Sequence, residues 1–257
     1  MHIQEHPQRR LASHTTQHEE EVVIELLLFH GFGDTAANFL GFADTLSLPA
    51  NVCVAGVDGA HDLAPLLGSP ERHLSYYSLE AIAGAPDLYV SDASERQRRR
   101  DGVAQVIAQR RTVHPAVKLC LFGYGQGADL LLDYLATGDR LPENVLCGVL
   151  MAPHTKSRLS LRKSPSLPTM VMIDGQSDTT AWKNALPTSR VLSLTAAPKE
   201  TNALGTAAGA LPRHPDDMRQ LITFLADQMA AVQQQSLAKM VEKGELHPVA
   251  HVHKENF

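Results

Sequence analysis

The sequence of 257 residues has three cysteines, one tryptophan and 5% aromatic residues, and it contains no long apolar run. Cys53, Cys120 and Cys147 are odd in number, far apart and form no CxxC pair. This pattern is typical of neither a disulfide framework nor a zinc site, and it favours a reducing compartment. The longest apolar stretch, Val22–Phe29, is interrupted by Glu25 and is far shorter than the roughly 20 residues that a membrane span requires. We therefore expect no membrane span.

The chain also lacks a strong charge of either sign. It has 23 basic and 28 acidic residues, which gives a net charge of −5 with histidine neutral. A mildly acidic chain is a poor partner for nucleic acid, so we expect no nucleic-acid partner. The chain has 44% hydrophobic residues. A chain of this length buries about 70–75% of the surface that its unfolded form exposes, so its core can be stable without disulfide bonds or a structural metal. We expect a folded core without a metal or other cofactor.

The two ends of the sequence differ from its middle. Residues 1–21 are polar and close on an acidic run, Glu19–Glu21, and they lack the apolar segment of a secretory signal. Arg9 and Arg10 are compatible with a mitochondrial presequence, whereas Glu5 and the acidic run argue against one. We predict a polar N-terminal tail over 1–21 and a cytoplasmic location, with the mitochondrion as the less favoured alternative.

After Gln233 the apolar periodicity is lost, and three histidines, His247, His251 and His253, stand near the end of the chain. Histidines at this spacing can bind a metal, but we favour a solvated helix end and tail over 234–257.

Between these ends, short apolar runs alternate with amphipathic stretches. The near-continuous runs are typical of strands buried on both faces, and the alternation predicts one α/β domain over 22–233, with a mostly parallel sheet and helices on both faces. The expected strands are Val22–Phe29, Val52–Val57, Val117–Phe122, Val145–Met151, Thr169–Ile173 and Val191–Leu194. The expected helices are Thr35–Leu46, Ser94–Arg111, Gln126–Ala136, Thr179–Leu186 and Pro215–Val232.

Three short segments follow expected strands, where open α/β sheets bind their ligands. They are His30–Asp34, with the sequence HGFGD, Gly123–Ala128, with GYGQGA, and Asp174–Asp178, with DGQSD. A late histidine, His214, precedes the last long helix. The order and context of these segments resemble the acyl-protein thioesterase and carboxylesterase branch of the α/β-hydrolase superfamily. The matching motifs of that branch are H-G-x-G-D, G-[FY]-S-Q-G-[GA], H-G-x-x-D and a late His.

The resemblance spans most of residues 22–232 and implies an α/β-hydrolase fold. It also implies an oxyanion hole formed by the backbone N–H groups of Phe32 and Gln126. The central Ser of the motif would be the nucleophile, but this sequence has Gly125 there. A chain without that hydroxyl retains only weak catalysis by the oxyanion hole and binding, so the sequence predicts an impaired enzyme.

The other two members of the expected triad are ambiguous. Asp178 matches the acid of the family, but an Asp that caps the following helix explains it equally well. His214 matches the base in chain order, whereas an ungapped alignment of the last helix puts Leu211 at that position. His214 is then a capping or surface residue.

Two functions follow from these features. The favoured one is a pseudoenzyme that acts by binding or scaffolding, with an acyl or carboxyl ligand in the residual pocket or a protein partner. The alternative is an unusual ester or thioester hydrolase in which His214 and Asp178 activate a water molecule above Gly125. We expect the arginine-rich helix 94–111 to present a solvated basic face rather than a site for an acidic partner.

Overall fold

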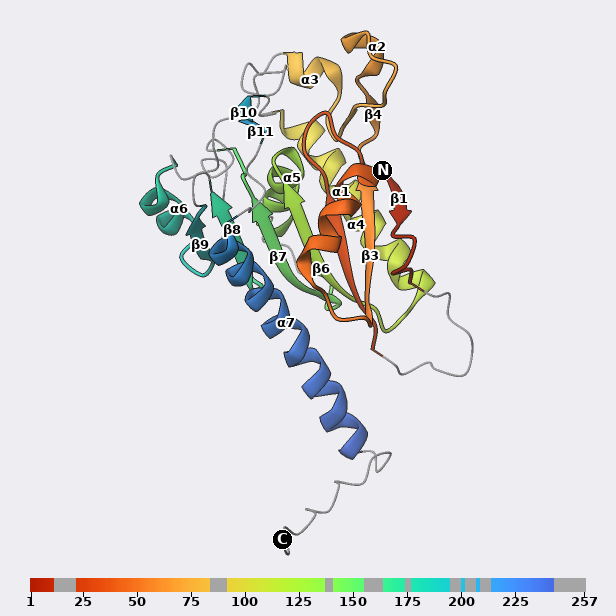
Figure 1. The fold of residues 1–257 in the computed structure, drawn as a ribbon, viewed down its shortest axis with the longest axis vertical. Helices are drawn as coiled ribbons and strands as arrows, with labels where there is room; N and C mark the ends of the chain where they lie inside the picture. The colour runs from red at the N-terminus through yellow and green to blue at the C-terminus, as the bar shows by residue number, and fades with distance from the viewer. Residues whose placement is uncertain are drawn as a thin grey trace, which may run out of the picture.

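The computed structural model describes residues 1–11, 22–83, 92–136, 141–154, 164–173, 177–194, 200–201, 207–208 and 214–242. Within these residues the fold is built on a seven-stranded sheet (Figure 1). In spatial order its strands are β1 (His2–Glu5), β3 (Val52–Asp58), β2 (Ile24–Phe29), β6 (Lys118–Tyr124), β7 (Val145–Met151), β8 (Thr169–Ile173) and β9 (Arg190–Ser193). Strand β1 is antiparallel to β3, and the other neighbours are parallel. The carboxyl ends of the parallel strands therefore meet at one edge of the sheet.

Helices cover both faces of this sheet. The long helices are α1 (Ala36–Ala43), α4 (Ala93–Val113), α5 (Gln126–Leu135), α6 (Thr179–Ala185) and α7 (Pro215–Glu242). The short elements are α2 (Ala64–Leu67), α3 (Leu79–Ala83), the 3₁₀ turn Asp44–Leu46, and the pairs β4 (His61–Asp62) with β5 (Leu74–Ser75) and β10 (Glu200–Thr201) with β11 (Ala207–Ala208). Helices α1 and α7 lie on one face, α4 and α5 lie on the other, and α7 runs past the end of the sheet (Figure 1).

Side-chain oxygens cap the first turn of several of these helices. Thr35 accepts a hydrogen bond from the Asn38 backbone N–H at the start of α1, and Asp92 accepts one from the Glu95 N–H at the start of α4. Such caps satisfy backbone donors that the first helical turn leaves unpaired.

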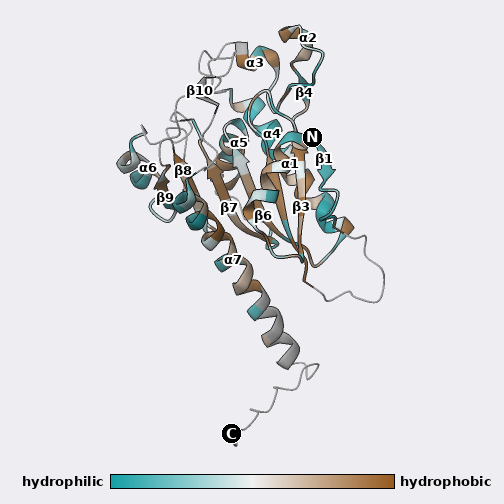
Figure 2. Ribbon diagram, in the orientation of Figure 1, coloured by the Kyte–Doolittle hydropathy of each residue, from teal (hydrophilic) through white to brown (hydrophobic). Residues whose placement is uncertain are grey.

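Two hydrophobic cores lie on opposite sides of the sheet. Alternate residues of β2 face each side: Leu27 and Phe29 belong to the core beneath α4 and α5, whereas Leu26 and Leu28 belong to the core beneath α1 and α7. Figure 2 shows the central strands, such as β3, β6 and β7, as strongly hydrophobic and the edge strand β1 as hydrophilic. Burial on both faces explains why the sequence of the central strands is continuously apolar.

The structure confirms the predicted mostly parallel sheet with helices on both faces, and the main elements begin within two residues of their expected starts. Helix α7 extends to Glu242, beyond the expected end at Val232. Within the described part of the chain, no helix has both the length and the apolar character needed to cross a membrane.

The first residues depart from the expected polar tail, because His2–Glu5 form the edge strand β1. His2 pairs with Asp58 and Glu5 pairs with Ala55 of β3. The Arg9 guanidinium then donates to the Pro49 carbonyl at 2.7 Å. Sequence periodicity missed this strand because an edge strand exposed on one side needs no apolar run. Residues 12–21, the rest of the expected tail, lie outside the described residues.

The arginine-rich helix α4 departs in part from the expected solvated face, because several of its arginines are paired within the domain. Arg110 is only 3% exposed and binds the buried Glu25 carboxylate of β2 through two hydrogen bonds of 2.7 and 2.9 Å. Arg96 and Arg100 both bind Asp133 of α5. These ion pairs join α4 to the sheet and to α5.

Candidate functional site

The chain turns sharply at Gly125, between β6 and α5. Gly125 has φ +51° and ψ −115°, a conformation that costs a residue with a side chain about 1–3 kcal/mol. Its N–H donates to the Met151 carbonyl at 2.9 Å. A Cβ added to Gly125 would have one neighbour within 4 Å, the Gly31 Cα at 3.8 Å. The turn therefore has the strand-to-helix geometry of a nucleophile elbow, with open space where a side chain would stand.

Gly123 and Gly127, each two residues from Gly125, are required by close backbone packing and not by a positive φ. A Cβ on Gly127 would lie 2.3 Å from the Phe29 carbonyl oxygen, and one on Gly123 would lie 2.5 Å from the Gly127 carbonyl oxygen. Strands β2 and β6 and the start of α5 therefore approach too closely for any side chain at these two positions.

The loop that follows β2 is held by a buried histidine. The His30 ring donates from Nδ1 to the Gly31 carbonyl at 2.7 Å, and its Nε2 accepts the Gly59 backbone N–H at 3.0 Å. Burial lowers the pKa of His30, which agrees with a neutral ring in this tautomer. His30 thus fixes the backbone that leads to Phe32.

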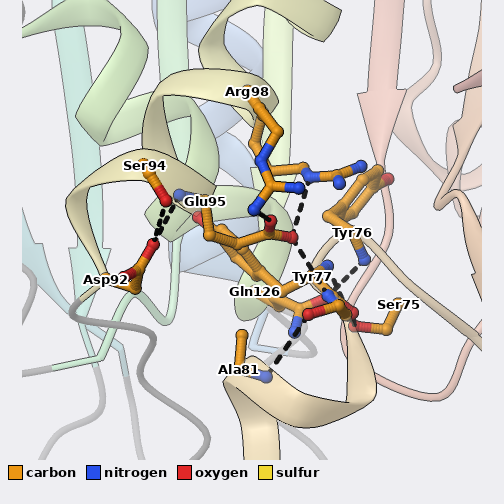
Figure 3. A network of polar contacts seen from close by, with 11 residues as sticks. Ser75, Tyr76, Tyr77, Ala81, Asp92, Ser94, Glu95, Arg98 and Gln126 are labelled. Carbon is orange, nitrogen blue, oxygen red and sulfur yellow. Dashed lines mark hydrogen bonds and ion pairs between the residues drawn. The ribbon is translucent and has the colours of Figure 1, made fainter.

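Tyr76 connects this loop to the elbow. Its hydroxyl accepts the His30 N–H at 2.9 Å and donates to the Val57 carbonyl at 2.6 Å. Its ring stacks on the His30 ring at 4.8 Å. Its backbone N–H donates to the Gln126 side-chain oxygen at 2.9 Å (Figure 3). Tyr76 therefore links the loop after β2, which carries the predicted oxyanion donor Phe32, to the second predicted donor, Gln126, at the start of α5.

A buried carboxylate extends this network to α4. The Glu95 carboxylate accepts the Ser78 backbone N–H at 3.1 Å and lies 2.9 Å from the Arg98 guanidinium (Figure 3). Ser75 donates to the same Gln126 oxygen at 3.1 Å. The segment between β5 and α3 is therefore fixed at both of its ends.

Asp178 and His214 each cap the start of a helix. The exposed Asp178 carboxylate accepts the Ala181 N–H at 3.0 Å at the start of α6. The His214 side chain is 45% exposed and lies 3.8 Å from the Asp216 carboxylate, and its Nδ1 accepts the Asp216 N–H at 3.3 Å. No contact between described residues joins these two side chains. Leu211 and 174–176 lie outside the described residues.

Among the described residues, no group of three or more His, Cys, Asp or Glu side chains is placed to hold a metal ion. The histidines at 247, 251 and 253 lie outside the described residues.

No protein-family model matches the sequence, and no curated protein sequence matches it. Solved structures do match. Acyl-protein thioesterase 2 of Zea mays aligns with a TM-score of 0.56 at 16% identity, over 88% of this chain and 97% of that chain. The chain has the α/β-hydrolase fold.

Two further structures of this fold give similar values. The carboxylesterase of Bacillus cereus aligns with a TM-score of 0.57 at 11% identity, over 88% of this chain and 93% of that chain. SOBER1 of Arabidopsis thaliana aligns with a TM-score of 0.55 at 13% identity, over 81% and 100%. At these identities the likeness establishes the fold alone, because one fold can host many activities.

The positive φ of Gly125 gives a direct stability prediction. Gly125→Ser should lower the free energy of unfolding by about 1–2 kcal/mol, because serine has to adopt left-handed backbone at a site with adequate room. Urea unfolding of both proteins measures the change. A neutral or stabilising substitution would contradict the strained elbow.

Proposed function

We propose that the protein is a catalytically silent member of the esterase and thioesterase group, and that it binds an acyl or carboxyl group at the elbow. The observation that carries the proposal is Gly125, which occupies an elbow at φ +51° and provides no nucleophilic atom. Without a nucleophile, an α/β-hydrolase site retains the oxyanion hole and substrate binding but loses covalent catalysis.

The elbow has the means to hold an oxygen atom of such a ligand. Gln126 is the first residue of α5, so its N–H points out of the helix end, where the helix dipole favours negative charge. The loop carrying Phe32 lies against the elbow, since Gly31 is the nearest neighbour of the space above Gly125. Two backbone donors at this place suit a carbonyl or carboxylate oxygen.

Binding of a simple carboxylate tests this proposal on the wild-type protein. Titration with sodium butyrate should shift the backbone amide signals of Phe32 and Gln126 in ¹H–¹⁵N spectra, whereas n-butanol, which has the same chain and no carboxylate, should not. A fluorophosphonate, which reacts with activated serines, should leave the protein unlabelled. Stoichiometric labelling of any serine would show that the nucleophile had been misplaced.

The hydrolase alternative makes a different prediction in the same protein. If His214 and Asp178 activated water, wild-type protein would hydrolyse p-nitrophenyl butyrate and His214→Ala would abolish that activity. The exposed capping contacts of both side chains weigh against this alternative.

The cysteines support a cytoplasmic location as a further part of the proposal. All three are free thiols, and Cys120 and Cys147 are buried. Burial raises the pKa of Cys53 to about 11, so its thiol stays protonated and unreactive at neutral pH. Unpaired cysteines are typical of reducing compartments.

A further inference from the structure

Gln126 brings a second hydrogen-bonding group to the elbow besides its backbone N–H. The residue is 1% exposed, and its side-chain Oε1 accepts the Tyr76 backbone N–H at 2.9 Å (Figure 3). The Ser75 hydroxyl lies 3.1 Å from the same oxygen, but it also lies 2.9 Å from the Tyr77 carbonyl oxygen. A hydroxyl has one proton to donate. The Tyr76 N–H is therefore the principal partner of Gln126 Oε1.

The oxygen, and not the nitrogen, is the atom through which this amide acts. Gln126 Nε2 is buried and has no hydrogen-bond partner among the described residues. Tyr76 is completely buried, so water cannot replace Oε1 as the acceptor of its N–H. Loss of that acceptor would leave a buried donor unpaired, which is costly. The Tyr76 backbone is thus held firmly to the start of α5.

Strand β5 and the residue before it hold the loop after β2. The Gly33 N–H donates to the Leu74 carbonyl at 2.9 Å, and the Leu74 N–H donates to the Asp34 carbonyl at 3.1 Å. The His73 Nδ1 donates to the Gly33 carbonyl at 2.9 Å. These three contacts fix the backbone directly after Phe32.

The same segment holds the loop before Phe32 as well, because the Tyr76 hydroxyl accepts the His30 N–H at 2.9 Å. Residues 73–76, the bridge segment, therefore contact the loop on both sides of Phe32 and reach the elbow through Gln126 Oε1. Two backbone donors hold one oxygen atom well only when both are pre-positioned to point at it. The bridge segment controls this spacing for the N–H groups of Phe32 and Gln126.

We propose that the Gln126 side chain is a positioning residue of the elbow. By holding the bridge segment through Oε1, it sets the distance between the Phe32 N–H and its own backbone N–H, and with it the affinity for a carbonyl or carboxylate oxygen. This inference rests on the proposed function, in which the elbow binds an acyl or carboxyl group. The role is separable from that of the backbone N–H, which a side-chain substitution leaves in place.

Variants of the full chain test this role with butyramide as the probe. Butyramide has a carbonyl oxygen and no charge, so a carboxylate introduced by substitution does not repel it. Gln126→Met keeps the length of the side chain and removes the acceptor, and it should raise the Kd for butyramide by about tenfold. Gln126→Glu keeps an oxygen that can accept the Tyr76 N–H, and its Kd should stay close to that of wild type. The Phe32 amide signal in ¹H–¹⁵N spectra reports binding.

Two further variants complete the set. Ile107→Val truncates a buried core residue of α4 that takes no part in these hydrogen bonds, and it should lower stability without changing the Kd. Gln126→Asn has a shorter amide that does not reach the Tyr76 N–H, and it provides the same test as Gln126→Met if the methionine variant does not fold.

Amide hydrogen exchange tests the inference without a ligand. Gln126→Met should speed exchange of the Tyr76 N–H, which loses its acceptor, and of the Gly33 N–H, which is bonded to the bridge segment. Exchange of the Ala152 N–H, which is bonded to the Met172 carbonyl at 2.7 Å, should stay at the wild-type rate. Local opening of this kind is what exchange rates report. A side chain with a purely local role would change the rate at Tyr76 and not at Gly33.

Three results would overturn the inference: an unchanged Kd in Gln126→Met, a loss of affinity that Ile107→Val reproduces, or faster exchange at Tyr76 that does not extend to Gly33. Failure of the proposed function gives a different result, in which wild-type protein binds neither butyramide nor butyrate. The exchange rates then still decide whether Gln126 positions the loop that carries Phe32.

Discussion

Arg110→Met should remove about 3–5 kcal/mol from the free energy of unfolding, because the substitution leaves a buried carboxylate without its partner. Glu25 is completely buried in β2, and the Arg110 guanidinium supplies both of its side-chain hydrogen bonds, at 2.7 and 2.9 Å. The same guanidinium reaches Glu5 of β1 at 3.0 Å. One substitution thus weakens the attachment of α4 and of the edge strand to the sheet.

The loss of stability in Arg110→Met should depend on pH, and the ionisation of Glu25 determines whether that loss grows or shrinks as pH falls. Burial raises the pKa of Glu25 above its ordinary value of 4.5, while the hydrogen bonds and charge of Arg110 lower it. Removing Arg110 leaves burial unopposed and raises that pKa further. A raised carboxyl pKa favours the folded state at low pH and penalises it as pH rises through the folded value. The deficit of Arg110→Met should therefore be largest at neutral pH and shrink as pH falls toward 4.5.

Urea unfolding at pH 7 and pH 5 measures both effects. The double substitution Arg110→Met with Glu25→Leu is the control, because replacing both partners by apolar residues removes the uncompensated charge and should restore most of the stability. A single substitution that costs less than about 1 kcal/mol, the usual value of an exposed pair, would contradict a buried role.

Gly127→Ala should destabilise the fold by about 3 kcal/mol or more, since overpacking against rigid backbone forces the chain itself to move. The new Cβ would lie 2.3 Å from the Phe29 carbonyl oxygen and 2.7 Å from the His30 carbonyl oxygen. These atoms belong to β2 and the loop after it, so neither can rotate away as a side chain would.

Gly41→Ala is the matched control for this substitution. Gly41 lies within α1, and a Cβ there would have no neighbour within 4 Å. Alanine should stabilise that helix by about 0.5–1 kcal/mol. Thermal unfolding of the two variants separates the effects. Equal changes at the two positions would show that the close approach of β2 to α5 is wrong.

The sequence predicted the parts of the fold that local pattern controls. The strands of the central sheet were predictable because burial on both faces makes them continuously apolar, as in Thr169–Ile173. The elbow was predictable because its three glycines recur at every second position between an apolar run and an amphipathic stretch, although the contact that requires Gly127 is with the distant Phe29 carbonyl oxygen. Its middle glycine, Gly125, carries the positive φ.

Features that depend on distant partners were not predictable. Arg110 is one arginine among several on α4, and its burial depends on Glu25, which is 85 positions away in the chain. The Asp129 carboxylate of α5 accepts the His154 backbone N–H, and the two residues meet because β7, which ends just before His154, lies beside α5. Asp178 and His214 matched the acid and base of the family in chain order, but a residue that caps a helix produces the same sequence pattern.

The edge strand β1 has a consequence for the behaviour of the protein in solution. It covers the hydrogen-bonding edge of β3, with four residues in register, and it brings polar side chains to that border. A chain shortened by its first eleven residues would expose the β3 backbone donors and acceptors along a run that includes Val54 and Val57. Open, apolar edges of this kind pair with other copies of themselves, so the truncated protein would precipitate on expression rather than lose only a terminal strand.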